Sequence, residues 1–106
     1  MSMMVDVLRE EKKRLQNLIH AYDEQISRLP KGSVSWKERK SGKYGYLAYR
    51  QVNSVRFDYL GKKGSEKAEI VEKDVRRRRE LEMKRSEAVQ NLKQIDRMLH
   101  AAKEPV

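Results

Sequence analysis

An aromatic, basic stretch in the middle of the chain, KYGYLAYRQVNSVRFDYLGKK, contains the residue types best suited to chemistry in this sequence. Residues 43–63 hold five of the seven aromatic side chains of the protein, interleaved with lysines and arginines. Lysine and arginine neutralise phosphate charge and aromatic rings stack on bases, so the mixture is typical of nucleic-acid contacts. The competing interpretation is that the rings form a small core, because a sheet of this size must bury one face.

Residues able to perform catalysis or bind a metal do not converge elsewhere in the sequence. His20 and His100 each lie on a predicted helix with no second ligand at metal-binding spacing, and the chain has no cysteine. The acidic pairs at 10–11 and 23–24 are adjacent on a helix, so they do not form an acid–base dyad. We therefore expect no enzyme, no metal site and no cofactor.

The positive charge is concentrated in the same region as the aromatic residues. The 106-residue chain has a formal net charge of +9, and residues 30–64 alone hold nine basic and two acidic side chains. This excess predicts a polyanionic partner. No apolar run approaches the roughly 20 residues needed to cross a bilayer. The first residues also lack the pattern of a secretory signal, so we expect a cytoplasmic protein without a membrane partner.

Two long amphipathic helices are predicted on either side of this region. Over residues 3–29 apolar side chains recur at every seventh position, and Pro30 ends the pattern. Over residues 65–102 a similar stripe follows Ser65, which is placed to cap the helix. Helices of these lengths in a chain that returns on itself predict an antiparallel two-helix coiled-coil hairpin.

The intervening residues 33–60 are predicted to form a small three-stranded antiparallel β-meander at the tip of the hairpin. Three runs alternate in polarity, and the pairs Ser41-Gly42 and Asn53-Ser54 mark the two turns. The expected fold is therefore mainly α, with residues 1–106 forming a single domain.

Strand alternation predicts which meander residues share a face, because side chains alternate with period two. Val55, Phe57 and Tyr59 share one face, and we assign them to the core with three residues of the earlier strands, Val34, Trp36 and Leu47. The basic residues then become the candidate nucleic-acid-binding surface: Lys37, Arg39, Lys43, Arg50, Arg56, Lys62 and Lys63.

The difference in helix length predicts how the helices pair and associate. The second helix is expected to extend about ten residues beyond the amino terminus of the first. Its apolar residues would then be half exposed, which predicts a homodimer through Leu92, Ile95, Met98 and Leu99. Antiparallel pairing in this register would place Glu11 opposite Arg85 as an ion pair. The alternative is that the arginines of the stripe extend into water.

The run LPKGSVSWKERKSGKYGYLAYRQVNSVRFDYLGKKG resembles the signature of a small uncharacterised prokaryotic family with coiled-coil helices. The matching positions are Leu29–Ser33, Tyr44–Arg50 and Tyr59–Gly61. This resemblance implies the fold and no particular function. The meander is also similar, more loosely, to the amino-terminal sheet of some transposases and to the DNA-binding sheets of phage-type integrases. Their catalytic motifs are missing here, so this second resemblance implies binding only.

Two functional hypotheses follow from these observations. The first is a non-enzymatic nucleic-acid-binding protein that presents its basic meander to phosphate, with DNA expected rather than RNA. The alternative is a structural or protein-interaction module, in which the coiled coil or a sheet edge binds a protein partner of unknown identity.

Overall fold

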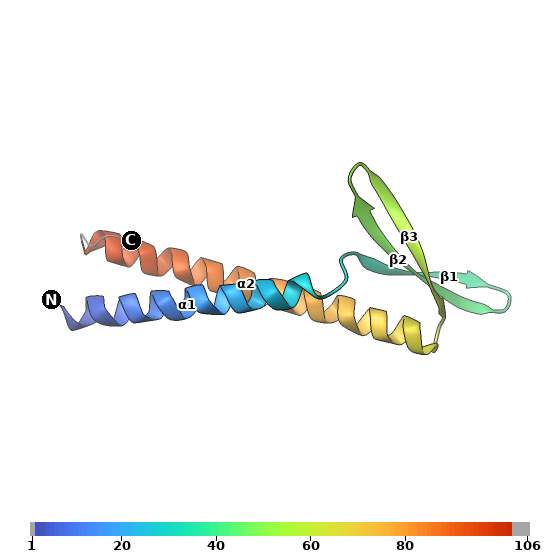
Figure 1. Ribbon diagram of the computed structural model, residues 1–106, viewed down its shortest axis with the longest axis horizontal. Coiled ribbons are helices and arrows are strands. Elements are labelled where there is room, and N and C mark those ends of the chain that lie inside the picture. The colour runs from blue at the N-terminus through green and yellow to red at the C-terminus, as the bar shows by residue number, and fades with distance from the viewer. Residues whose placement is uncertain (1, 103–106) are drawn as a thin grey trace. The chain divides into compact units, whose positions relative to one another are not determined.

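The computed structural model describes residues 2–102, which form a helix, three strands and a second helix (Figure 1). The elements are α1 (Met3–Ser27), β1 (Ser33–Arg39), β2 (Gly42–Gln51), β3 (Ser54–Lys62) and α2 (Glu66–Ala101). The predicted order of helix, meander and helix is confirmed. The expectation of a mainly α chain holds in part, because strands of 7, 10 and 9 residues make up a complete sheet.

The chain divides into two compact units, and α2 contributes to both. One unit, the sheet unit, is Ser27–Glu80; the other, the helical unit, joins the residues before it to those from Leu81 on. In the helical unit the two helices lie side by side (Figure 1). The buried apolar side chains of this unit are Val5, Leu15, Leu81, Ala88 and Leu99.

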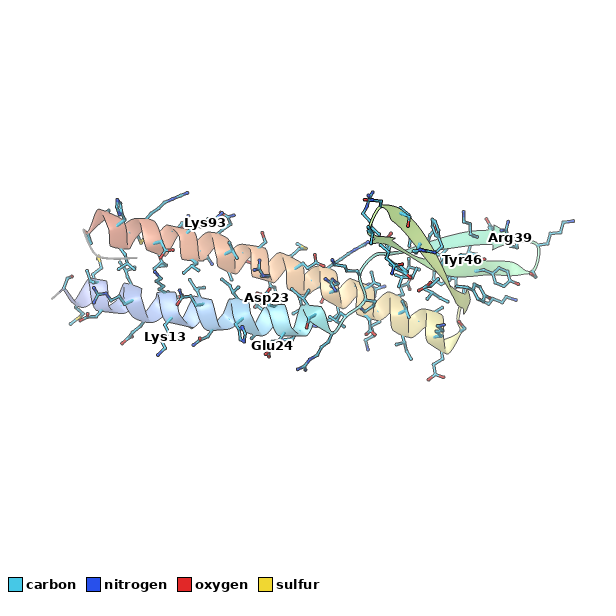
Figure 2. The ribbon with its side chains drawn as sticks, turned by 45° about the horizontal axis from the view of Figure 1, so that its top comes forward. Lys13, Asp23, Glu24, Arg39, Tyr46 and Lys93 are labelled. Atoms are coloured by element: carbon cyan, nitrogen blue, oxygen red, sulfur yellow. The ribbon has the colours of Figure 1, made fainter. Side chains whose placement is uncertain are left out.

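Two ion pairs between the helices define an antiparallel register. Lys12 Nζ lies 3.0 Å from Asp96 Oδ1, and Arg85 Nε donates a hydrogen bond to Asp23 Oδ1. The pairs are eleven residues apart on each helix and run in opposite chain directions, as antiparallel helices require. Asp23 faces α2, whereas Lys13 and Lys93 point away from the partner helix (Figure 2).

The predicted helix register is wrong, because Arg85 pairs with Asp23, twelve residues further along α1 than Glu11. The two helices also end together: Val5 and Leu8 line the same hollow as Met98. The extra length of α2 is therefore at its amino-terminal end, in the sheet unit, and does not extend beyond α1 as we expected.

Glu11 has a different partner from the one predicted. Arg14 donates hydrogen bonds from Nε and Nη2 to the two carboxylate oxygens of Glu11, at 2.9 and 2.6 Å. These hydrogen bonds lower the pKa of Glu11 and raise the pKa of Arg14. A local pair three residues apart on one helix forms at little entropic cost, so Glu11 is satisfied within α1.

The three strands form an antiparallel sheet in the order β1-β2-β3. The first turn is formed by residues 40 and 41 and the second by Val52 and Asn53, each one residue earlier than predicted. The second turn forces Val52 into the left-handed region, with φ of +53°. A β-branched residue is strained there, and the Val52 side chain is 86% exposed, so no buried contact offsets that strain.

Replacing Val52 with asparagine is expected to raise the free energy of unfolding by about 1 kcal/mol, because asparagine tolerates left-handed dihedrals. Urea denaturation followed by circular dichroism measures the difference. Val55→Asn is the matched control, since Val55 is also exposed but lies in a strand. Asparagine disfavours strands, so the control should lose stability. Equal changes in the two variants would show that strain at Val52 is not the cause.

Candidate functional site

The strand register divides the sheet into two faces, which we call the inner and the outer face. On β1, Val34 and Trp36 alternate with Lys37 and Arg39, and the pairing extends this alternation across β2 and β3. Tyr44 and Tyr46 share a face because they are two residues apart on β2, and a bulge that leaves Leu60 of β3 unpaired puts Lys62 on the same face as Tyr59. The inner face holds Val34, Trp36, Glu38, Lys43, Gly45, Leu47, Tyr49, Arg56, Asp58 and Leu60; the outer face holds Lys37, Arg39, Tyr44, Tyr46, Arg50, Val55, Phe57, Tyr59 and Lys62.

The inner face packs on the first part of α2. Trp36 Nε1–H donates a hydrogen bond to Glu72 Oε2 at 3.2 Å, and Leu60 is only 4% exposed. The indole of Trp36 also covers Gly45, where an added Cβ would lie 2.8 Å from its ring. The glycine between two tyrosines in the sequence therefore leaves room for the tryptophan of the neighbouring strand.

Hydrogen bonds fix both ends of this part of α2. Ser65 caps α2, as predicted, by accepting a hydrogen bond at 3.4 Å from the Ala68 N–H. Arg78 donates from Nη1 to the carbonyl of Leu29 at 2.6 Å. Leu29 lies in the segment between α1 and β1, so this bond joins that segment to α2. Arg78 is therefore partly buried by a contact with the backbone between α1 and β1.

The prediction that Val55, Phe57 and Tyr59 belong to the core is wrong. Their side chains are 51%, 60% and 51% exposed, and all three lie on the outer face. Val34, Trp36 and Leu47 do lie on the inner face, as expected. Alternation correctly grouped the residues of β3, but the helix covers the opposite face, where Leu60 supplies the buried side chain.

Charge differs between the two faces of the sheet. Among the strand residues, the outer face carries four basic side chains and no acidic one, whereas the inner face carries two of each. The acidic residues Glu38 and Asp58 both fall on the inner face. Asp58 accepts a hydrogen bond from Tyr49 at 3.4 Å, and it lies on the opposite face from Arg50. Arg50 is therefore available on the outer face and does not serve as the partner of Asp58.

Aromatic rings occupy the middle of the outer face. The ring of Tyr59 lies 5.4 Å from that of Tyr46 and 6.4 Å from that of Tyr44, measured between centroids. Beside them, Lys37, Arg39, Tyr46 and Phe57 line a shallow hollow of about 220 Å³. Figure 2 labels Arg39 and Tyr46 on the sheet. The outer face thus joins exposed rings to basic side chains on one surface.

The predicted binding residues separate into two groups. Lys37, Arg39, Arg50 and Lys62 lie together on the outer face, whereas Lys43 and Arg56 lie on the inner face and Lys63 follows β3. From the sequence the rings can serve as stacking surfaces, but Phe57 and Tyr59 are assigned to the core, so no ring of the outer face is among the predicted binding residues. The available signal was the position of the acidic residues, because Glu38 and Asp58 both alternate away from these rings.

The predicted association residues are mostly buried within the helical unit itself. Leu99 is 1% exposed, and Leu92 and Ile95 are half-buried, so these three pack mainly within their own chain. Only Met98 presents substantial apolar surface, at 52% exposure. The expectation that Leu99 is available to a second copy is therefore wrong, because the helix ends coincide.

Neither a metal cluster nor a membrane span is found in the part of the chain that the structure describes. Within residues 2–102, no three histidine or acidic side chains gather closely enough to hold a metal ion. Neither helix carries an apolar stretch long enough to cross a membrane, again among the described residues.

The fold and the site define a class of protein in which a small basic, aromatic sheet is inserted between two long helices. Its family is a domain of unknown function: residues 4–69 match the model of the DUF6788 family, and the chain belongs to that family. The match covers α1, the whole sheet and the start of α2. No curated protein and no solved structure matches the chain.

Proposed function

We propose that this protein binds nucleic acid, without catalysis, through the outer face of its sheet. The observation that carries the proposal is the distribution of charge and rings: four basic side chains and four aromatic rings share a face that has no acidic strand residue. Phosphates require cations, and the rings provide surfaces for bases or groove walls. The loose resemblance to the DNA-binding sheets of transposases and integrases supports the same function, with DNA as the expected ligand.

The test is a salt titration of binding to labelled DNA. If all four outer-face cations contact phosphate, the logarithm of the binding constant should fall with the logarithm of salt concentration with a slope of about −3 to −4. Fluorescence anisotropy measures the slope. Absence of binding at low salt, or binding that salt does not weaken, would overturn the proposal.

We propose in addition that the ends of the helical unit join two copies of the chain, extending the helix pair into a coiled-coil dimer. Support comes from an apolar hollow of about 660 Å³ lined by Met4, Val5, Leu8, Met98 and Ala101. Two of its lining residues, Met4 and Met98, are 71% and 52% exposed. Surfaces of this kind are commonly buried against a partner.

Sedimentation velocity over a concentration series tests the dimer. The unmodified protein should associate, and Met98→Asp should remain monomeric, because a carboxylate in a buried apolar contact is unfavourable. Met83→Asp is the matched control, since Met83 is a 73% exposed methionine on the same helix outside the hollow. A monomeric unmodified protein, or equal effects of the two variants, would contradict the proposal.

A further inference from the structure

The outer face carries more exposed aromatic surface than phosphate binding requires. Phe57 is 60% exposed and Tyr59 51% exposed, both on β3, which forms an edge of the sheet. Exposing such rings to water is unfavourable by about 25 cal/mol per Å² of apolar surface. Lysine and arginine alone would hold a phosphate backbone. The rings therefore need a ligand that offers apolar flat surfaces.

We infer that this ligand is single-stranded nucleic acid, whose unpaired bases stack on Phe57 and Tyr59; the inference rests on the proposed function. In a duplex the base faces are already stacked on one another and hidden from a flat protein surface. A single strand can turn its bases outward, and each base has a face that accepts an aromatic ring. A single strand therefore matches both chemical components of the outer face.

The spacing of the Phe57 and Tyr59 rings also favours single-stranded nucleic acid as the ligand. Phe57 and Tyr59 are two residues apart on one strand, so their attachment points are separated by about 6.8 Å. This distance is about twice the step of about 3.4 Å between stacked bases in a duplex strand. Two neighbouring bases can lie on these two rings only if the nucleic acid is extended and the bases are unstacked from each other.

The cations are placed to hold the backbone of such an extended strand. Arg50 is paired with Val55 at one end of the ring row, and Lys62 is paired with Tyr44 at the other. Lys37 and Arg39 extend from β1 and line one hollow with Phe57. Positive charge therefore borders the row at both ends and along one side, leaving the free edge of β3 open.

Anisotropy titrations of the full chain with three probes test the inference. The probes are an oligothymidylate of about 20 nucleotides, an oligouridylate of the same length and a duplex of the same length, compared at one salt concentration. The single strands should bind at least about tenfold more tightly than the duplex. The tighter binder of the two, oligothymidylate or oligouridylate, shows whether the preferred ligand is DNA or RNA.

Substitutions of Phe57 test whether bases stack on its ring. Phe57→Leu, which keeps apolar volume and removes the ring, should weaken single-strand binding about 5- to 100-fold, whereas Phe57→Trp should retain it. Val55→Leu is the control, because Val55 lies in the same row without a ring. Phe57 is exposed, so each variant should remain folded, as circular dichroism will show.

The outcomes separate this inference from the proposed function. Duplex binding as tight as single-strand binding, with no loss in Phe57→Leu, would overturn the inference while the proposed function stands. Absence of binding to all three probes at low salt would overturn both. Loss of a captured protein in Phe57→Leu, without loss of oligonucleotide binding, would assign the rings to a protein partner and also overturn the inference.

Discussion

An Arg39→Glu/Arg50→Glu variant is expected to bind nucleic acid about 100-fold more weakly than the unmodified protein. Both arginines lie on the outer face, where the strands carry no acidic residue. Reversal removes two attractive contacts and adds two repulsive ones beside the phosphates. The slope of the salt dependence should also fall by about two, since about two fewer counterions are displaced.

The inner face provides a control matched in charge. A Lys43→Glu/Arg56→Glu variant changes the same number of basic residues in the same sheet, and both variants lower the formal net charge from +9 to +5. It should retain affinity within about threefold, because screening weakens charges that lie away from the ligand. Anisotropy at low salt compares the two, and circular dichroism checks folding. Equal losses would show that net charge, and not the outer face, governs binding.

Replacing Trp36 with alanine is expected to produce the largest loss of stability in the sheet unit. Truncating a fully buried tryptophan lowers the free energy of unfolding by about 3–5 kcal/mol. Because Trp36 is half-buried, its truncation should lower the free energy of unfolding by about 2 kcal/mol or more. The variant removes the ring that covers Gly45 and leaves Glu72 without its indole donor. Urea denaturation followed by circular dichroism measures the change.

Two substitutions separate the contributions to this loss. Trp36→Phe keeps a ring above Gly45 and removes the hydrogen bond to Glu72, so its free energy of unfolding should fall by only about 1 kcal/mol. Phe57→Ala truncates an aromatic of the same sheet on the outer face and should change stability little, because Phe57 is 60% exposed. If Phe57→Ala proved as destabilising as Trp36→Ala, the assignment of the two faces would be wrong.

The sequence predicted the elements well because their signals are local. Seven-residue spacing before Pro30 and the cap at Ser65 gave the helices within two residues of their observed ends, Ser27 and Glu66. Tight turns and alternation gave the three strands. Each of these signals depends on neighbouring residues in the chain, so each can be recognised without knowledge of the tertiary contacts.

The face that packs on α2 could not be obtained from the same signals. Alternation defines two sets of side chains, and the set with Phe57 and Tyr59 is as apolar as the set with Trp36 and Leu60. The choice depends on two tertiary details, the bulge at Leu60 of β3 and the fit of the indole over Gly45. The prediction of the helix register was wrong for a related reason. The start of α2 belongs to the sheet unit, and only with this knowledge can one infer that the end of α2 lies level with the start of α1.

The separation of charge between the two faces also affects how a polyanion would approach the sheet. The outer-face strand residues produce a positive field that extends about 10 Å into solution at 0.1 M salt, whereas those of the inner face sum to zero. Such a field turns an approaching polyanion toward one face before any contact forms. Charge on the outer face should therefore act mainly on the rate of association, and ring contacts mainly on the rate of dissociation.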